Sequence, residues 1–484
     1  MGTSKLIDSS AAFLFEVPGS NSPLVVQELQ IGGPSRAARE DRGGTAAVAY
    51  PQERIILRTS IETVPGSPVV GSAMPIAKAE TAKLLLLENV NDSAVELLRS
   101  SGFSAIERQP KALEGDALRA ALKGISLLGI RSRTALTEGV FAAADQLTAV
   151  GCFSVGTNQV DLDAARKRGI PVFNAPFSNT RSVAELVIGE IVMLLRQIFP
   201  RSVAAHDGGW DKSAAGSREV RGRTLGIIGY GNIGSQLSTL AEAMGMRVIY
   251  FDRTDKLRHG NTEPVDRLET LLAQSDVVSL HVPETPETHN MIGARELRLM
   301  KPGSCLINNS RGTVVDLDAL ASALRDGHLA GAALDVFPVE PSSNSERFQS
   351  PVQGLKNVIL TPHIGGSTEE AQERIGREVA RKLLDYCVNG STMGAVNFPQ
   401  VQLHARAHGV RFSHVHHNVP GMLRRLNEVF LQRDINIAAQ YLETDSDVGY
   451  VVLDVDIADH DCSELLGEIR ALEGTISARL IYQH

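Results

Sequence analysis

Thr224-Leu-Gly-Ile-Ile-Gly-Tyr-Gly-Asn-Ile-Gly234 is followed by a helix-like segment and then by Arg247-Val-Ile-Tyr-Phe-Asp252. An apolar strand running into glycines spaced G-x-G-x-x-G, with a carboxylate about 20 residues further on, is typical of a dinucleotide site. Gly229 allows the tight turn, Gly231 lets the backbone approach a pyrophosphate, and Gly234 lets the helix pack closely on the strand. The N-terminus of the helix then receives the phosphate charge. The alternative is an ordinary turn between a strand and a helix.

The carboxylate of Asp252 indicates which dinucleotide to expect. It can accept hydrogen bonds from the ribose hydroxyls of NAD, whereas the 2′-phosphate of NADP would meet like-charge repulsion there. Arg253 beside it is the residue type that NADP sites use, so this position also carries an argument for NADP. We predict NAD, because the carboxylate ends the strand.

Length and composition limit the possible functions. The chain has 484 residues, of which 43% are hydrophobic and 21% charged, as in a globular protein of roughly three domains. Without an apolar run of about 18 residues, we expect no membrane span. The net charge of −8 argues against a chain-wide surface for nucleic acid. The four cysteines lack C-x-x-C spacing, so we expect neither disulfides nor zinc, and a cytoplasmic location.

The chain divides by composition and periodicity. Residues 1–78 are rich in Gly, Ser, Pro and Ala without a sustained period, and we predict a disordered extension. From residue 83 onward, apolar strands alternate with helical segments, which predicts parallel sheets covered on both faces. A first group of strands is expected at 83–88, 125–130 and 147–151, and a long helix at 181–197. Six more strands at 224–229, 247–252, 277–281, 304–308, 331–336 and 358–360 predict a Rossmann domain.

The last 80 or so residues predict a separate module after the linker at 389–394. Strands are expected at 410–417, 435–443, 449–457 and 476–482, and helices at 421–432 and 463–472. This βαββαβ order is ferredoxin-like.

Five ordered segments carry a family resemblance. They are Gly229 to Gly234, Ser279 to Thr288, Met300 to Asp316, Ala333 to Pro341 and Thr361 to Gly366, and together they resemble the D-isomer-specific 2-hydroxyacid dehydrogenases. From about residue 83 to 482 the chain is also similar to the D-3-phosphoglycerate dehydrogenases with one C-terminal ACT domain. That narrower match is carried by Gly129-Ile-Arg-Ser-Arg-Thr134, 149–153, 156–162, 174–185 and Asn436-Ile-Ala-Ala-Gln-Tyr441.

The resemblance implies a domain plan of the α/β class. A Rossmann NAD-binding domain, residues 181–366, is expected inside a flavodoxin-like substrate-binding domain of residues 79–180 that is completed by about 367–395. An ACT domain of residues 396–484 follows. The family also implies a homotetramer.

Three residues match the catalytic set of the family. Oxidising a 2-hydroxy acid requires a base for the hydroxyl proton, a hydride acceptor and a cation for the substrate carboxylate. His363 matches the general acid/base, Glu340 its carboxylate partner and Arg311 the carboxylate clamp. We expect the carboxylate to fix the tautomer of the imidazole and to raise its pKa. Outside these motifs, His363 would be interpreted as a loop histidine, Glu340 as a surface acid and Arg311 as a salt-bridging arginine.

The resemblance also implies the contacts with NAD. Asp252 is expected at the adenosine ribose, and Asp335 at the carboxamide of the nicotinamide. The full set of expected NAD-binding residues is Gly229, Gly231, Asn232, Ile233, Gly234, Asp252, Asn309, Ser310, Arg311, Asp335, His363, Ile364, Gly365 and Gly366.

A phosphate on the substrate would need cations. Arg131 and Arg133, on either side of Ser132 at a strand end, match the phosphoglycerate enzymes; the alternative is an ordinary exposed pair of charges. Asn179 and Lys212, the latter from a neighbouring subunit, are expected to add to this site together with Arg311. The expected substrate is therefore D-3-phosphoglycerate.

The ACT resemblance implies a site for L-serine as an effector, with His416, Asn418 and Asn436. Amide side chains suit this role because they can bind both ends of a zwitterion. A metal site among the nearby histidines is not expected, because strand alternation places His417 on the face opposite His414 and His416.

The expected function is NAD-dependent oxidation of D-3-phosphoglycerate to 3-phosphohydroxypyruvate, the first step towards serine, with feedback inhibition by serine. One alternative is another D-2-hydroxyacid dehydrogenase, including one that reduces 2-oxoglutarate to 2-hydroxyglutarate. A second alternative, from a different class, is a nucleotide-sensing regulator similar to the corepressors that share this fold.

Overall fold

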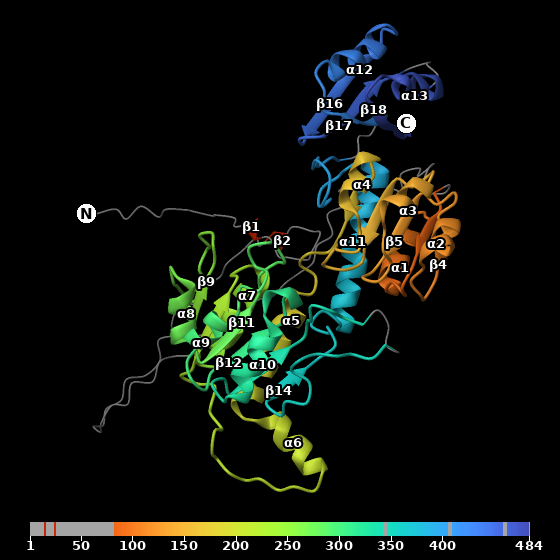
Figure 1. Ribbon diagram of the computed structural model, residues 1–484. Coiled ribbons are helices and arrows are strands. Elements are labelled where there is room, and N and C mark those ends of the chain that lie inside the picture. Colours follow the sequence, from red (N-terminus) through yellow and green to blue (C-terminus); the bar gives the residue numbers. More distant parts are fainter. Residues whose placement is uncertain are drawn as a thin grey trace, which may run out of the picture. The chain divides into compact units, whose positions relative to one another are not determined.

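The computed structural model describes residues 14–15, 24–25, 82–341, 346–404, 409–457 and 462–483. The predicted disordered extension, residues 1–78, lies outside this part of the chain except for two short strands, β1 (Leu14–Phe15) and β2 (Leu24–Val25), which pair antiparallel. The other strands form two parallel sheets and one antiparallel sheet (Figure 1).

The first parallel sheet has five strands in the order β4-β3-β5-β6-β7. This is the flavodoxin-like order, because the second strand along the chain lies at the edge next to the first. Its strands are β3 (Leu84–Leu86), β4 (Ile106–Arg108), β5 (Leu127–Ile130), β6 (Ala149–Cys152) and β7 (Val172–Phe173). Its helices are α1 (Asp92–Ser100), α2 (Gly115–Ala121), α3 (Glu138–Ala143) and α4 (Leu162–Lys167).

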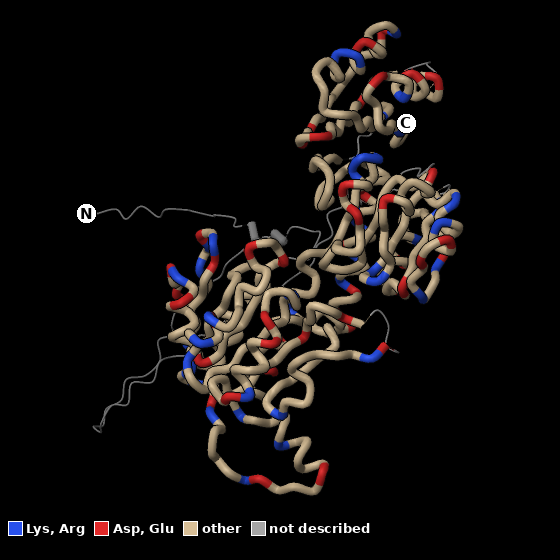
Figure 2. The backbone as a smooth tube through the Cα atoms, in the orientation of Figure 1, with Lys and Arg blue, Asp and Glu red and all other residues tan. Residues whose placement is uncertain are grey.

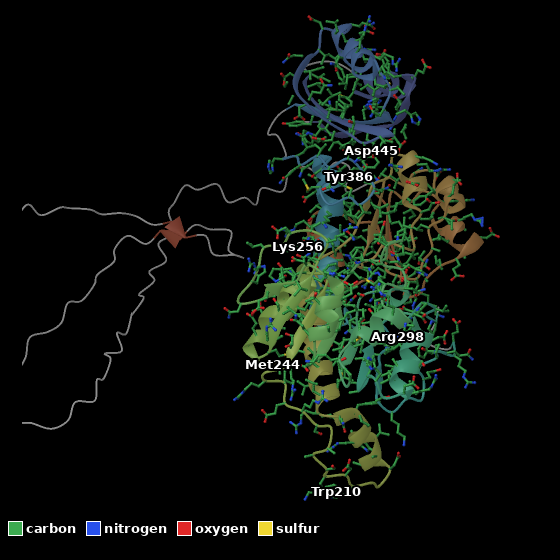
Figure 3. The ribbon with its side chains drawn as sticks, turned by 60° about the vertical axis from the view of Figure 1, so that its left-hand side comes forward. Trp210, Met244, Lys256, Arg298, Tyr386 and Asp445 are labelled. Atoms are coloured by element: carbon green, nitrogen blue, oxygen red, sulfur yellow. The ribbon has the colours of Figure 1, made fainter. Side chains whose placement is uncertain are left out.

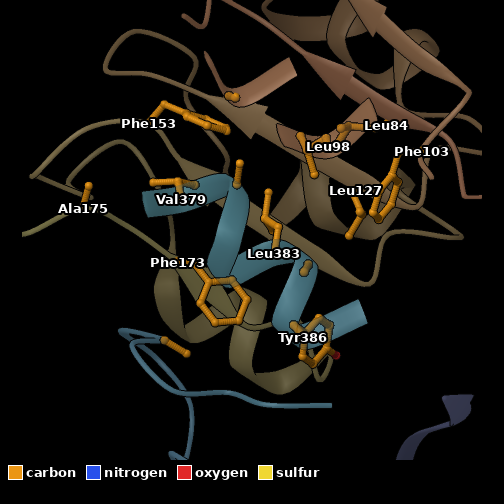
Figure 4. Close-up of a cluster of buried hydrophobic side chains, with 14 of the residues drawn as sticks. Leu84, Leu98, Phe103, Leu127, Phe153, Phe173, Ala175, Val379, Leu383 and Tyr386 are labelled. Carbon is orange, nitrogen blue, oxygen red and sulfur yellow. The ribbon is translucent and has the colours of Figure 1, made fainter. Parts of the chain in front are cut away.

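A helix from much later in the chain covers one face of this sheet. The apolar side of α11 (Glu369–Asn389) presents Val379, Leu383 and Tyr386 to the strands (Figure 4). The approach is close: a Cβ on Gly151 in β6 would lie 2.7 Å from Val379 and 2.8 Å from Leu383. Glycine in the strand therefore lets the helix reach the sheet.

The second parallel sheet has seven strands in the order β10-β9-β8-β11-β12-β13-β14, which is the Rossmann order with one strand added. They are β8 (Thr224–Ile228), β9 (Arg247–Phe251), β10 (Glu263–Pro264), β11 (Val277–Leu280), β12 (Cys305–Asn308), β13 (Gly331–Leu334) and β14 (Val358–Leu360). The accompanying helices are α5 (Thr180–Leu195), α7 (Asn232–Ala243), α8 (Leu268–Gln274), α9 (Ala294–Leu299) and α10 (Leu317–Arg325), with a 3₁₀ turn, η1, at Gly312–Val314.

Both parallel sheets are buried on two faces. Leu84 and Leu86 in β3 belong to one core cluster, and Leu85 between them belongs to the cluster on the opposite face. This is why the strands are near-continuous runs of Leu, Ile and Val instead of alternating with polar residues. The loops at the carboxyl ends of such strands are where ligands bind in this class of fold.

The expected long helix at 181–197 ends earlier than predicted. Helix α5 ends at Leu195, Gln197 has a left-handed φ of 54°, and a second helix, α6 (Ile198–His206), follows. Helix α6 has no buried residue, and Trp210 just beyond it is 85% exposed (Figure 3). This apolar exposure is typical of a surface that contacts another protein.

The antiparallel sheet has the order β16-β17-β15-β18. Its elements are β15 (Val410–His417), α12 (Met422–Leu431), β16 (Asn436–Thr444), β17 (Val448–Asp456), α13 (Cys462–Ala471) and β18 (Thr475–Gln483). The βαββαβ order predicted from the sequence is therefore confirmed, as is the α/β class of the chain.

The described surface has no single sign of charge. Acidic and basic residues are interspersed along the backbone (Figure 2). Among the helices of the described residues, none is long and apolar enough to cross a bilayer.

Candidate active site

The glycine turn between β8 and α7 needs glycine at two positions for reasons within the chain. Gly229 has a φ of 92°, and a Cβ there would lie 2.6 Å from the carbonyl oxygen of His281. A Cβ on Gly234 would lie 2.5 Å from the carbonyl oxygen of Gly229. The tight turn and the close packing of the helix on the strand therefore both depend on the missing side chains.

Gly231 differs, because no contact within the described part of the chain requires glycine there. Its φ is −86°, and a Cβ would meet no atom within 4 Å. It precedes Asn232 and Ile233 in the first turn of α7, which has no side-chain cap. An open approach to uncapped backbone N–H groups fits the pyrophosphate of a dinucleotide.

Asp252 directly follows β9 beside the same turn. Its Oδ2 accepts a hydrogen bond from Tyr230 N at 2.9 Å, and its Oδ1 accepts from the backbone and the hydroxyl of Thr254, both at 3.0 Å. Burial opposes ionisation, but these hydrogen bonds outweigh it and lower the pKa of the carboxyl. The group is therefore an anion that can also accept from ribose hydroxyls.

The loop after β12 carries Asn309, Ser310 and Arg311. The side chain of Asn308 braces it: Oδ1 accepts from Ser310 N at 3.1 Å, and Nδ2 donates to the carbonyl oxygen of Arg311 at 2.9 Å. Arg311 Nη1 donates to the carbonyl oxygen of Ser310 at 2.7 Å. A Cβ on Gly156, in the loop after β6, would lie 3.6 Å from Arg311 Nη2, so the guanidinium reaches this loop.

Glu190, which was not singled out in the sequence, fixes the side chain of Asn309 by a hydrogen bond. It lies within α5 with no exposed surface, and its Oε2 accepts from Asn309 Nδ2 at 2.9 Å. Burial raises its pKa to about 8, against the smaller opposing effect of the Asn309 hydrogen bond. An acid inside the apolar pattern of α5 was the available signal, but its partner lies 119 residues away.

Asp335, at the end of β13, organises the loop that carries His363. The residue is 1% exposed, and its carboxylate accepts from Thr361 Oγ1 at 2.6 Å, Ile364 N at 2.8 Å and Gly365 N at 2.7 Å. A Cβ on Gly365 would lie 2.9 Å from Asp335 Oδ2, so the missing side chain allows this contact. The bond expected between Asp335 and a carboxamide stays a prediction.

His363 and Glu340 form a pair at this edge of the sheet. The ring Nδ1 lies 2.8 Å from Glu340 Oε2 and 3.1 Å from Oε1, and Phe337 N donates to Oε1. The bond with Glu340 raises the pKa of His363, although partial burial opposes it. Because Nδ1 is occupied, Nε2 is the atom that can exchange a proton.

Arg311 and Glu340 are brought together by two crossing loops. A Cβ on Gly312 would lie 1.9 Å from the backbone carbon of Phe337, so only glycine fits where the loops pass. His363, like Gln197, has a positive φ, 54°, which is unusual for a residue with a side chain and typical of functional sites. The three predicted catalytic residues therefore lie on neighbouring loops at one edge of the Rossmann sheet.

The predicted substrate residues lie in three places. Arg131, Ser132 and Arg133 form the loop after β5, and Ser132 and Arg133 are exposed. Asn179 lies beside the His363 loop, since a Cβ on Gly366 would lie 2.5 Å from its Nδ2. Lys212 lies in the exposed segment after α6, and among the described residues no hydrogen bond or ion pair links it to the other five.

The predicted effector residues do not meet within one ACT sheet. His416 is buried at the end of β15, and Asn418 donates to the carbonyl oxygen of Asp445 at 2.8 Å. Asn436 lies at the other end, paired with Asp456 in β17. The length of β17 separates Asn418 from Asn436 by roughly 25 Å, from a rise of about 3.3 Å per residue.

Known proteins resemble this chain over most of its length. The sequence profile described as D-isomer specific 2-hydroxyacid dehydrogenase, NAD binding domain, matches residues 188–365, and that of an AHAS small subunit-like ACT domain matches residues 412–477. The chain is 58% identical over 401 residues to D-3-phosphoglycerate dehydrogenase of Escherichia coli (strain K12), an alignment covering 83% of this chain and 97% of the relative. It is 46% identical over 413 residues to D-3-phosphoglycerate dehydrogenase 1 of Saccharomyces cerevisiae, covering 83% and 87%.

A solved structure agrees with this. D-Lactate dehydrogenase from Aquifex aeolicus, complexed with NAD and lactic acid, has a TM-score of 0.58 and 28% sequence identity, covering 66% of this chain and 100% of that one. A Rossmann sheet with a dinucleotide turn and a paired histidine and glutamate at its carboxyl edge defines an NAD-dependent oxidoreductase. The chain belongs to the D-isomer specific 2-hydroxyacid dehydrogenase family, among its D-3-phosphoglycerate dehydrogenases.

The open space at Gly231 gives a test of the dinucleotide site. We expect Gly231→Ala to melt at the wild-type temperature but to bind NADH roughly tenfold more weakly, because a methyl group obstructs the pyrophosphate. Gly189→Ala in α5 is the control, since a Cβ there also meets nothing within 4 Å. Titration calorimetry with NADH measures the affinity, and an unchanged value for Gly231→Ala would contradict the assignment.

Proposed function

We propose that this chain oxidises D-3-phosphoglycerate to 3-phosphohydroxypyruvate with NAD, the first step of the phosphorylated route to serine. The observation that carries the proposal is the His363–Glu340 pair, 2.8 Å apart, on the loops beside Arg311 and the dinucleotide turn. The names of the relatives at 58% and 46% identity support this substrate over other 2-hydroxy acids.

NAD, when bound, accepts the hydride from C2 of the substrate. The first turn of α7, which Gly231 leaves accessible, would hold the pyrophosphate, and Asp252 would hold the adenosine ribose. Asn309 and Ser310 would hold the nicotinamide ribose, and the loop from His363 to Gly366 would enclose the nicotinamide ring. Asp335 sets the position of that loop through its own hydrogen bonds.

His363 acts as the base. Its Nε2 takes the proton of the C2 hydroxyl while the C2–H bond breaks, so that the C–O bond becomes a carbonyl. Glu340 holds the Nδ1–H and stabilises the imidazolium that forms. In the reverse direction the same imidazolium returns the proton to the carbonyl oxygen.

Arg311 binds the carboxylate of the substrate. A guanidinium offers two parallel N–H donors, which match the two oxygens of a carboxylate. Its positive charge also polarises the neighbouring C2 oxygen. Its position follows from the Asn308 bonds and from the crossing at Gly312.

The phosphate lies against Arg131, Ser132 and Arg133, and Asn179, which lies beside Gly366, adds an amide to the substrate site. Two guanidinium groups and a hydroxyl supply charge and donors for a phosphate. Lys212 completes the site from a second subunit, consistent with its place on an exposed segment after α6.

L-Serine binds between two ACT domains in this proposal. The separation of Asn418 and Asn436 within one sheet favours a site to which two copies each contribute one residue. A homotetramer follows if the exposed apolar residues of α6 and Trp210 form a second contact between chains. The four free cysteines favour the cytoplasm.

A panel of acids tests the substrate. We expect kcat/KM for D-3-phosphoglycerate to exceed that for D-lactate and D-2-hydroxyglutarate by about a hundredfold or more, because unpaired polar groups reject an analogue lacking the phosphate. NADH formation measures each rate. Equal rates would refute the substrate, and no turnover of any acid would favour a nucleotide-sensing regulator.

The pH profile tests the roles of His363 and Glu340. Oxidation needs a neutral imidazole, so the rate falls as pH decreases through the His363 pKa, which Glu340 raises. Glu340→Gln should lower the pKa of His363, so its oxidation rate should fall only at a lower pH than in the wild type. The reductive direction needs the imidazolium and loses rate as the pH rises; in Glu340→Gln we expect that loss to begin at a lower pH as well. We also expect kcat to fall by about 10² or more, because an amide can hold the wrong tautomer.

The control for this experiment is Glu263→Gln, which removes an exposed ion pair with Arg247 in the same domain. We expect its pH profile to match that of the wild type. A Glu340→Gln profile that also coincides with the wild type would exclude Glu340 as the partner of the acid/base.

Inhibition by serine tests the effector site. We expect Asn436→Ala to need about tenfold more serine for half inhibition, since an amide contact with a charged ligand is lost, while kcat stays the same. Asn427→Ala is the control, because Asn427 is a half-buried amide on α12 bonded to Gln440. If Asn436→Ala remains as sensitive as the wild type, Asn436 does not bind the effector.

A further inference from the structure

Glu88 is an acid with an unusual backbone directly after β3. The residue is 7% exposed, its φ is 62°, and the next residue, Asn89, has a φ of 54°. Two consecutive residues with side chains in the left-handed region are unfavourable unless the surroundings hold them there. Neither residue belongs to the catalytic or dinucleotide site described above.

The carboxylate of Glu88 is bound to the backbone of one loop. Its Oε1 accepts from Arg131 N at 3.2 Å and from Thr134 N at 2.8 Å, and its Oε2 accepts from Arg133 N at 2.9 Å. Strands β3 and β5 are parallel neighbours, paired through Leu86 and Gly129, so both segments end at the same edge of the sheet. Three N–H groups directed at one anion fix the path of the loop.

Further contacts also fix the path of the loop from Arg131 to Thr134. Gln159 Nε2 donates to the carbonyl oxygen of Arg131, whose N–H group donates to Glu88. Both backbone polar groups of Arg131 are therefore hydrogen-bonded. Thr134 is fully buried, whereas Ser132 and Arg133 are exposed. The main chain is thus bound from the inside, and the side chains at 132 and 133 are directed outward.

We propose that Glu88 is a positioning residue for the substrate phosphate, which it serves by fixing the backbone from Arg131 to Thr134 so that the two arginines flank one anion site. The proposal rests on the proposed function, since it takes Arg131 and Arg133 as the phosphate ligands. Glu88 itself touches neither substrate nor cofactor. Its effect is therefore expected on the phosphate-bearing substrate alone.

The test uses Glu88→Gln in the full chain. One oxygen becomes an NH₂ group, which cannot accept from a backbone N–H, so the loop loses at least one of three bonds. We expect KM for D-3-phosphoglycerate and the inhibition constant of inorganic phosphate to rise by about tenfold, from the loss of charge-assisted bonds. KM for NAD, and kcat/KM for D-lactate, which has no second anionic group for the two arginines to bind, should stay within about twofold, because Glu88 contacts neither the dinucleotide turn nor the catalytic residues.

Two further variants make the test decisive. Glu107→Gln, an exposed acid on the neighbouring β4, is the matched control and should leave every constant unchanged. Glu88→Asp keeps the charge but shortens the side chain, and we expect a smaller rise in KM and in the phosphate inhibition constant. If Glu88→Gln does not fold, this variant carries the test, with NADH binding as the check on folding.

The outcomes separate the inference from the proposed function. If Arg131→Ala raises KM for D-3-phosphoglycerate but a folded Glu88 variant keeps the wild-type KM and phosphate inhibition, Glu88 is not a positioning residue. If a Glu88 variant lowers kcat/KM for D-lactate and raises KM for NAD by the same factor, its role is general stability and the inference is also wrong. If Arg131→Ala leaves KM unchanged, the phosphate site itself is misassigned.

Discussion

Carboxylates that accept backbone N–H groups at the carboxyl ends of parallel strands hold the loops on which the rest of the site depends. Glu88 follows β3, Asp252 follows β9, and Asp335 follows β13; together they accept hydrogen bonds from seven backbone N–H groups. A hydrogen bond to a charged group contributes about 1.5–3 kcal/mol, roughly twice a neutral one. Each loop is therefore held by its own anion as well as by packing.

In the His363 loop, hydrogen bonds to a carboxylate offset the cost of a strained backbone. A residue with a side chain at positive φ costs about 1–3 kcal/mol. Asp335 accepts two backbone N–H groups and one hydroxyl from the same loop, which is enough to offset that cost. The strain places the imidazole against Glu340 while its Nε2 remains available for proton exchange.

The fold could be read from the sequence because its signals are local. All six strands expected in the Rossmann domain are present, since buried parallel strands are continuous apolar runs. The glycine turn was also readable, and the structure adds that Gly229 and Gly234 serve the protein itself while Gly231 leaves space for a ligand. The predicted catalytic residues came from ordered motifs, and in the structure they lie on adjacent loops.

What the sequence could not provide depends on distant partners. Glu88 and Glu190 are acids inside apolar segments, and their roles are visible only with partners 43 and 119 residues away. The break between α5 and α6 was missed because Gln197, and not glycine or proline, takes the left-handed conformation. Lys212 does not meet the other predicted substrate residues within one chain, and the predicted effector residues do not meet one another. Each of these two predicted sites is expected to combine residues from two chains.

The opposite placement of Asn418 and Asn436 has a consequence for stoichiometry. A pair of ACT domains related by a twofold axis contains each combination of the two residues twice. If two ACT domains pair in this way with the proposed effector residues between them, they form two equivalent pockets, and each chain contributes one half to both. A small zwitterion bound in either pocket then acts as a non-covalent crosslink, so its binding energy also strengthens the association of the chains.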